Sequence, residues 1–231
     1  MSEPTNPTVP AGPAQPLDTH VLARTAEHLA QRYAGVFSAD LVERMVFESY
    51  AALARTARVR THLAPLAGHF AADRLAALAH ARATSTADPR HAGVPQVLFV
   101  GEHDTGRAPI AAALLAHHAG DTLTVRSAGL LPGTGLEPHV RTALAERGID
   151  TEDLYPKPVT DDVVAGADWV ITFGTLDGIP MPGAAIHQDW DVNDVLEADP
   201  GAVAAVIDEL QDRVQALHEQ IRTHPPVPPE Q

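Results

Sequence analysis

Cysteine is absent from this chain of 231 residues. Its absence excludes disulfides, thiolate metal sites and a cysteine nucleophile. Basic residues are also few, since 16 lysines and arginines stand against 30 aspartates and glutamates, for a formal net charge of −14. Phosphate contacts require clusters of basic side chains, so nucleic acid is not an expected partner.

Long apolar segments are missing as well. No run approaches the ~20 residues that span a bilayer, and the N-terminus lacks a basic region followed by an apolar stretch. We therefore expect a cytoplasmic protein with no membrane partner. Apolar side chains are nevertheless plentiful. Hydrophobic residues make up 45% of the chain, which is enough for a sizeable core without covalent cross-links.

Composition divides the chain into five segments. Residues 1–16 contain five prolines and little apolar surface, so we expect a disordered tail. Residues 17–84 hold three amphipathic stretches and predict a small three-helix bundle, whose surface is a candidate contact for a protein partner or a second copy. Asp-Pro, glycine and proline signals over 85–95 indicate a linker. A domain over 96–223 and a proline-rich tail over 224–231 complete the chain.

Within the bundle we expect a first helix over about 19–34, capped by Asp18, and a third helix over about 61–83. The second helix is expected to begin after a cap at Ser38 or Asp40 and to end at about residue 56. From Gln96 onward, short apolar runs alternate with helical stretches. The expected strands are 97–100, 123–127, 169–173 and 184–187, and the expected helices are 107–118, 138–147, 161–165 and 201–222. This rhythm predicts an α/β fold with a four-stranded parallel sheet flanked by helices. Ligands of such sheets bind at the carboxyl ends of the strands.

One loop lies at such an end, between Gly101 and Gly106, and Arg107 then opens a helix. A strand, a glycine-bounded loop and a helix start bring several backbone N–H groups and the positive end of the helix to one point, which suits an oxyanion. The spacing of the two glycines also fits a nucleotide P-loop. That pattern continues with Lys and then Ser or Thr, whereas this chain has Arg107 and Ala108. A glycine turn that binds no ligand is the third alternative.

Residues 96–222 resemble the low-molecular-weight tyrosine phosphatases and thiol-linked arsenate reductases. The family motif is Val-Leu-Phe-Val-Cys, five residues, Arg and Ser. Here Val97-Leu98-Phe99-Val100-Gly101 is followed by five residues, Arg107 and Ala108. Further matches follow in the family's order: Ser127-Ala128-Gly129 with Pro132-Gly133, Pro138 with Ala143-Leu144 and Gly148-Ile149-Asp150, Lys157 to Asp162, Ala167 to Thr172, and Gln188 to Asp194. The resemblance implies the phosphatase-like fold, and the N-terminal helices resemble the three-helix extension of some actinobacterial members.

The resemblance also identifies what this chain has lost. The family's nucleophilic cysteine corresponds to Gly101, so no thiophosphate or thioarsenate can form. Reductase members carry further cysteines where this chain has Thr175 and Ile179, and the family's serine after the arginine is Ala108. The resemblance therefore excludes both arsenate reduction and thiol-dependent dephosphorylation.

The oxyanion loop itself is retained. The candidate phosphate-binding residues are Glu102, His103, Asp104, Thr105, Gly106 and Arg107. Arg107 supplies the planar fork that suits phosphate. By the resemblance, Asp104 stands where an asparagine braces the loop, and His103 is expected to pack or brace. We expect no cofactor and no metal site, although Glu102, His103 and Asp104 are weak candidates for a divalent ion bound together with substrate phosphate.

Two functions remain open. Asp194 matches the family's leaving-group acid, although Val195 follows it in place of proline, and Glu102 adds a carboxylate that opposes a phosphate dianion unless it is protonated or turned away. The first hypothesis is a non-thiol hydrolase of a phosphorylated small molecule, such as a nucleotide or sugar phosphate. Glu102 and Asp194 are then its catalytic residues, one activating water and the other protonating the leaving group. The second is an inactive pseudophosphatase that binds an oxyanion or a partner, with both carboxylates as solvated acids.

Overall fold

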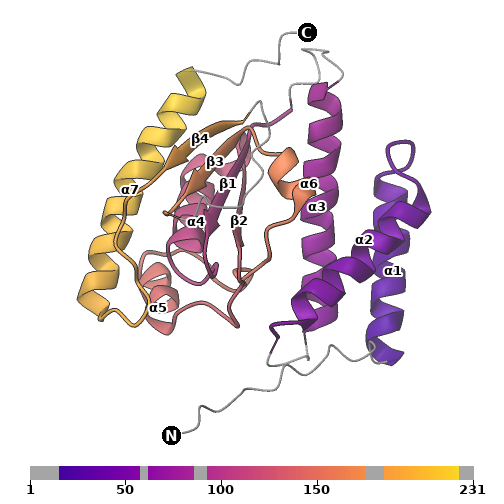
Figure 1. Ribbon diagram of the computed structural model, residues 1–231, viewed down its shortest axis with the longest axis horizontal. Coiled ribbons are helices and arrows are strands. Elements are labelled where there is room, and N and C mark those ends of the chain that lie inside the picture. The colour runs from indigo at the N-terminus through magenta and orange to yellow at the C-terminus, as the bar shows by residue number, and fades with distance from the viewer. Residues whose placement is uncertain (1–15, 58–61, 86–92, 175–184, 224–231) are drawn as a thin grey trace, which may run out of the picture. The chain divides into compact units, whose positions relative to one another are not determined.

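The computed structural model describes residues 16–57, 62–85, 93–174 and 185–223 (Figure 1). The expected N-terminal tail up to residue 15, most of the expected linker, the positions Thr175 and Ile179, and the C-terminal tail lie outside the described residues. Two compact units make up the chain, Met1–Ala72 and Asp73–Gln231.

The first unit contains α1 (Pro16–Arg32), α2 (Ala39–Ala54) and the start of α3 (Leu63–Ser85). Ser38 caps α2 as expected, because its hydroxyl accepts the Leu41 N–H at 3.3 Å. The expectation that Asp18 caps α1 is wrong, since the helix begins two residues earlier. The Asp18 carboxylate instead accepts a 2.7 Å hydrogen bond from the Tyr50 hydroxyl and so joins α1 to α2.

The second unit is built on a four-stranded sheet in the order β2-β1-β3-β4. Its strands are β1 (Gln96–Gly101), β2 (Thr124–Gly129), β3 (Trp169–Thr172) and β4 (Ile186–Asp189). Every pairing is parallel, as the alternating pattern predicted. The fourth strand starts two residues later than expected.

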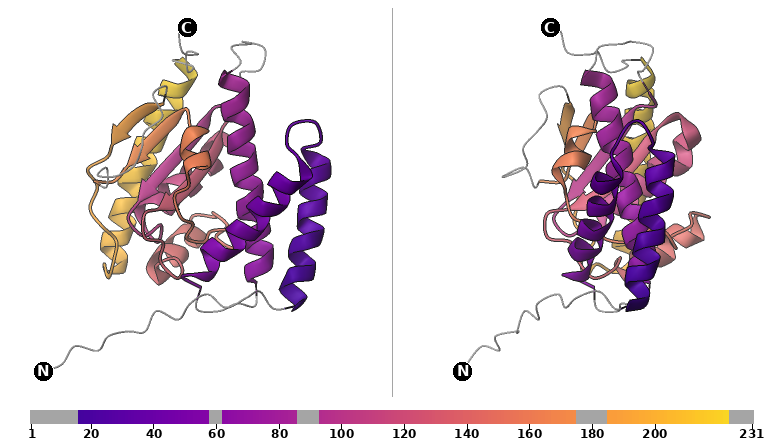
Figure 2. Two further views of the ribbon diagram at one scale, coloured as in Figure 1. Left: turned by 45° about the vertical axis from the view of Figure 1, so that its right-hand side comes forward. Right: turned by 90° about the vertical axis from the view of Figure 1, so that its right-hand side faces the viewer.

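Helices cover both faces of this sheet: α4 (Arg107–Ala119), α5 (Pro138–Glu146), α6 (Asp161–Ala165) and α7 (Pro200–Thr223), with a 3-10 turn over Gly120–Thr122. Along β1, Val97 and Phe99 pack with α4, α5 and α7, whereas Leu98 and Val100 pack with α6 and with Ala77 of α3. Figures 1 and 2 show α7 and α6 on opposite sides of the sheet. No helix within the described residues has the length and apolar composition needed to cross a membrane.

The second half of α3 belongs to this α/β unit. Nη2 of Arg74 lies 2.8 Å from Oδ2 of Asp162, and both side chains are nearly buried. Nε2 of His80 lies 3.0 Å from Oδ2 of Asp168, the same oxygen that accepts the Gln96 N–H. The compact units therefore divide within α3, whereas proline and glycine signals mark a loop after it. Proline and glycine signals show where a helix ends, but they do not show which unit the helix packs with. The predicted domain boundaries therefore stay a prediction.

Candidate active site

The loop singled out from the sequence leaves the carboxyl end of the central strand. β1 pairs with β2 on one side and β3 on the other, and all six of its residues are buried. The chain then passes through residues 102–106 and enters α4 at Arg107. We call residues 101–108 the cradle.

The carbonyl groups of the cradle point outward, toward residues 130–137. Four N–H groups donate to four cradle carbonyls: Leu130 to Gly101 at 3.1 Å, Leu131 to Glu102 at 2.8 Å, Gly133 to His103 at 2.8 Å, and Glu137 to Thr105 at 3.0 Å. Across a trans peptide, the following N–H points the opposite way, and none of the described peptide bonds is cis. The N–H groups that follow these carbonyls belong to Glu102, His103, Asp104 and Gly106, and none of them donates to an acceptor within the described residues. They face the hollow side of the loop.

The start of α4 adds to this concentration of donors. Gly106 is its N-cap and supplies no side-chain acceptor, so the first-turn N–H groups remain without intrahelical partners. The helix end carries a partial positive charge at the same place. Loop and helix together form the arrangement that binds an oxyanion through backbone donors.

Asp104 braces the cradle from beneath. It has a positive φ of 53° and is 2% exposed, and its Oδ2 accepts the Lys157 N–H at 2.9 Å. Burial raises the pKa of Asp104 to about 6, against the opposing effects of the Lys157 ammonium, the Lys157 N–H and the Ser127 hydroxyl. The role of a brace, which the family resemblance suggested, agrees with this position. Lys157 had not been identified as a site residue from the sequence, because the contact crosses 53 positions.

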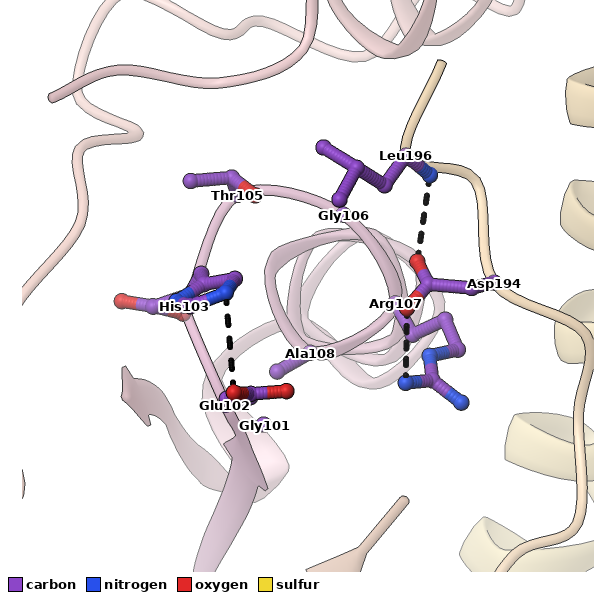
Figure 3. A pocket seen from close by; sticks show the side chains of 10 residues that line it. Gly101, Glu102, His103, Thr105, Gly106, Arg107, Ala108, Asp194 and Leu196 are labelled. Carbon is purple, nitrogen blue, oxygen red and sulfur yellow. Dashed lines mark hydrogen bonds and ion pairs between the residues drawn. The ribbon is translucent and has the colours of Figure 1, made fainter. Parts of the chain in front are cut away.

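Glu102 and His103 lie together at the rim (Figure 3). The His103 Nδ1 is 2.9 Å from the Leu131 carbonyl oxygen. A carbonyl can only accept, so Nδ1 carries the proton in this contact. The other ring nitrogen, Nε2, is 3.7 Å from Oε1 of Glu102, whose side chain is 56% exposed. In the described part of the chain, no arginine or lysine pairs with Glu102.

Arg107 is held against the loop that follows β4. Its Nη1 donates to the Val192 carbonyl at 2.9 Å, and its Nη2 donates to Oδ2 of Asp194 at 3.1 Å. The guanidinium lies over the Phe173 ring, 5.6 Å from the centroid. These contacts keep the positive charge at the mouth of the cradle and use one N–H of each terminal nitrogen.

Asp194 uses its second oxygen to shape its own loop. Oδ1 accepts the N–H groups of Val195 and Leu196 at 2.7 and 3.1 Å. Val195, which stands in place of the family's proline, is 2% exposed and lies directly above Gly106. A Cβ at position 106 would be 2.4 Å from Val195 Cγ2, so the close approach of the two loops requires glycine there.

All the candidate residues surround one pocket, which is open to solvent. Its lining comprises Gly101, Glu102, His103, Asp104, Thr105, Gly106, Arg107, Ala108, Asp194 and Leu196. The fold thus brings Glu102 and Asp194 together across 92 positions of sequence, as the resemblance implied. Leu196 was not identified from the sequence, because an apolar side chain in an acidic loop carries no chemical signal. The roles of these residues in binding or catalysis stay predictions.

The three weak candidates for a divalent ion point to different partners. Asp104 binds the Lys157 N–H, and the His103 Nδ1 binds the Leu131 carbonyl, while Glu102 remains at the rim. No group of three or more His, Asp or Glu side chains among the described residues is arranged to hold a metal ion.

Two family models match this chain. One describes the N-terminal domain of protein-tyrosine-phosphatase-like proteins and matches residues 22–79, and the other describes the low molecular weight phosphotyrosine protein phosphatases and matches residues 96–177. A solved thioredoxin-dependent arsenate reductase from Corynebacterium glutamicum is 44% identical, with a TM-score of 0.76. The match covers 89% of this chain and 98% of that one. The chain belongs to the low-molecular-weight phosphatase family.

Other members are more distant. An arsenate reductase solved in a phosphate-binding state is 23% identical over 55% of this chain and 98% of its own, with a TM-score of 0.49. The arginine phosphatase YwlE from Geobacillus stearothermophilus is 22% identical over 56% of this chain and 94% of its own, with a TM-score of 0.47. The resemblance inferred from the motifs is confirmed, including the N-terminal helical domain. This phosphatase-like protein has neither the nucleophilic nor the resolving cysteines of its family.

Proposed function

We propose that this phosphatase-like protein binds the phosphate group of a phosphorylated small molecule in the cradle, without a covalent bond to it. The observation that supports this most directly is the direction of the loop peptides. Four cradle carbonyls accept hydrogen bonds from residues 130–137, which lie outside the pocket. The N–H groups on the other side of the same peptides therefore point toward the pocket. The bare backbone at Gly101 offers no nucleophile, so the bound anion stays free to leave.

In this proposal Arg107 changes partner when the anion binds. In this structure its two terminal nitrogens donate to the Val192 carbonyl and to the Asp194 carboxylate. A phosphate above the cradle competes for these nitrogens, because it can accept from both at once. The same arginine also contacts the loop that carries Asp194. Anion binding therefore changes the contacts that hold this loop in place. A phosphate-responsive binding module that acts on a partner, with the N-terminal helices as a contact surface, fits this arrangement.

Hydrolysis is a second candidate function, because Glu102 and Asp194 line the same pocket. In such a reaction Glu102 takes a proton from water, and the water oxygen bonds to phosphorus or to the sugar carbon while the bond from that atom to the leaving oxygen breaks. Protonated Asp194 then gives its proton to the leaving oxygen. Asp194 pairs with Arg107 in this structure, so the arginine must first move to the anion.

Calorimetric titration with inorganic phosphate, arsenate and a nucleotide monophosphate tests binding. We expect wild type and Arg222→Ala, which changes an exposed arginine near the end of α7, to bind phosphate alike. Arg107→Ala is expected to weaken binding about tenfold or more, because a charge-assisted bidentate contact is lost. No binding to wild type, or equal binding to Arg107→Ala, would overturn the proposal.

Turnover of a panel of phosphorylated metabolites tests hydrolysis separately. Loss of an activity in both Glu102→Gln and Asp194→Asn supports acid–base catalysis by these carboxylates. An activity that survives both substitutions contradicts those roles and leaves the binding proposal standing.

A further inference from the structure

The mouth of the cradle carries more negative than positive charge. Glu102 and Asp194 line it together with Arg107 as its single guanidinium, and that guanidinium is already paired with Asp194 at 3.1 Å. Among the described residues, the one basic side chain paired with Glu102 is the His103 imidazole, at 3.7 Å. The buried carboxyl group of Asp104 lies beneath the same loop.

This distribution of charge disfavours the binding of a phosphate dianion that carries no positive charge of its own. The backbone donors attract it, but the rim carboxylates repel it at short range, and each repulsion grows where the pocket excludes water. Arg107 carries one positive charge, which already offsets Asp194, so it cannot also offset the phosphate and Glu102. A ligand that brings its own positive charge removes this conflict.

We infer that the ligand of this site is a phosphate monoester that carries an organic cation, such as an ammonium group, two or three bonds from the ester oxygen. This inference rests on the proposed phosphate site. The phosphate occupies the N–H groups of residues 102–104 and 106 and the Arg107 side chain, and the ammonium group faces the Glu102 carboxylate, with Asp194 as its second neighbour.

The surroundings of Glu102 favour an organic cation over a metal ion. Mg²⁺ requires several oxygen ligands in near-octahedral geometry. The neighbouring Asp104 carboxylate is turned to Lys157, and the His103 Nδ1 to Leu131. An ammonium group needs only one or two acceptors. Leu196, whose 52% exposed side chain also lines the pocket, offers an apolar surface to the methylene groups between the phosphate and the cation.

Figure 3 shows the two rim carboxylates on different sides of the loop. Glu102 lies on the side of the loop that carries His103, and Asp194 lies beside Arg107. A phosphate above the end of α4 therefore has a carboxylate on either side of it. An inorganic anion cannot use either one, whereas a flexible ammonium arm can reach one or both.

The test compares two phosphate esters that differ only in charge. Aminoethyl phosphate and propyl phosphate have the same length, but only the first has an ammonium group. We expect calorimetry to show that wild type binds aminoethyl phosphate about fivefold more tightly, the size expected for a partly exposed ion pair. Higher ionic strength should reduce this preference.

Substitution of the rim carboxylate should remove the preference. In Glu102→Gln, the ratio of the two dissociation constants is expected to fall below about twofold, while propyl phosphate binds more tightly than it does to wild type. Glu146→Gln is the matched control, since Glu146 is an exposed glutamate at the end of α5 that does not line the pocket. It should keep the wild-type ratio.

The outcomes separate this inference from the function on which it rests. If both esters bind equally and Arg107→Ala weakens both, the phosphate site stands and the cation inference is overturned. If neither ester binds, both are overturned. If propyl phosphate binds as tightly as aminoethyl phosphate when Mg²⁺ replaces EDTA in the buffer, the rim carboxylates bind a metal and the inference is wrong.

Discussion

Nη2 of Arg107 and Oδ2 of Asp194 form an ion pair of 3.1 Å that joins the cradle to the loop after β4. The arginine side chain is 18% exposed and the aspartate side chain 58%. The guanidinium that an oxyanion would need is therefore held by a carboxylate at the mouth of the pocket. Anion binding and this ion pair therefore draw on the same single positive charge.

Removing the competing charge should strengthen anion binding. In Asp194→Asn the amide oxygen can still accept the Val195 and Leu196 N–H groups, but Arg107 loses its ionic partner. We expect inorganic phosphate to bind about threefold to tenfold more tightly, because a carboxylate is removed from the rim and the arginine is released. Isothermal titration calorimetry measures the change.

Asp191→Asn serves as the control for that substitution, because Asp191 is exposed in the same loop and does not line the pocket. It should leave phosphate affinity within about twofold of wild type, since an exposed charge outside the pocket is well screened. Weaker phosphate binding to Asp194→Asn would show that the aspartate holds Arg107 in its anion-binding position instead of competing for it.

The buried carboxylate of Asp104 gives a second prediction, on stability. Its pKa is raised from 3.8 to about 6 by burial, so the folded protein holds this proton more tightly than the unfolded chain. Between pH 4 and 6 the free energy of unfolding therefore falls as pH rises. The destabilising effect is fully present above about pH 6 and disappears below about pH 4.

Asp104→Asn should remove this dependence. The amide oxygen can still accept the Lys157 N–H, and asparagine tolerates the positive φ at this position. We expect the variant to be more stable than wild type by about 3 kcal/mol at pH 7.5 and equally stable near pH 4. Urea unfolding of both proteins across this range gives the difference. A difference that stays constant with pH would contradict the assignment.

Patterns in the sequence predicted the sheet well, because each signal is local. The apolar run Val97–Val100 is a fully buried central strand, and Gly101–Gly106 marks the turn at its carboxyl end. Contacts that depend on distant partners could not be predicted. The pairing of Arg107 with the Val192 carbonyl crosses 85 positions, and the pairing of Asp18 with Tyr50 crosses 32. A capping residue and a cross-helix acceptor have the same side-chain chemistry, so composition alone could not distinguish them.

The site shows the same limit. The resemblance placed Glu102 and Asp194 near one pocket, because the family's motifs fix the order of strands and loops. It could not predict that Val195 packs against Gly106, since a valine after the aspartate departs from the family's pattern. The orientation of the cradle peptides also depended on residues 130–137, a loop rich in glycine and proline that carries no periodic signal.

The contact between Gly106 and Val195 gives a third prediction. In Gly106→Ala the added methyl group would meet Val195 Cγ2, and the β-branched valine cannot easily turn away. We expect a loss of about 1–3 kcal/mol in the free energy of unfolding. Val195→Ala alone should cost about 2 kcal/mol, as expected when a buried aliphatic side chain is shortened.

A double-mutant cycle separates this contact from other effects. If the clash dominates, the double variant should recover at least half of the loss caused by Gly106→Ala, so that the two changes are strongly non-additive. Additive losses would show instead that position 106 requires glycine for reasons other than its contact with Val195.

The absence of native cysteine permits a direct test of the cradle's electrostatics. In Gly101→Cys the protein has a single thiol at the carboxyl end of β1, next to the donors of residues 102–104 and 106 and to the end of α4. A Cβ at position 101 would lie 3.3 Å from the Ala108 Cβ, so the side chain fits after a shift of a few tenths of an ångström. Converging N–H groups and a helix N-terminus stabilise a thiolate, so we expect its pKa to fall from about 8.5 to about 7 or below. The pH dependence of iodoacetamide alkylation measures this pKa.

The matched reference for that thiol is Ala145→Cys, at an exposed position on α5, where the thiol pKa should stay near about 8.5. Inorganic phosphate should slow alkylation at position 101 and leave position 145 unaffected, because an anion in the cradle covers the first thiol and repels its ionised form. Equal pKa values at the two positions would mean that the rim carboxylates cancel the attraction of the backbone donors. An anion-binding cradle requires the donors to prevail, so the lowered pKa and the phosphate protection should appear together.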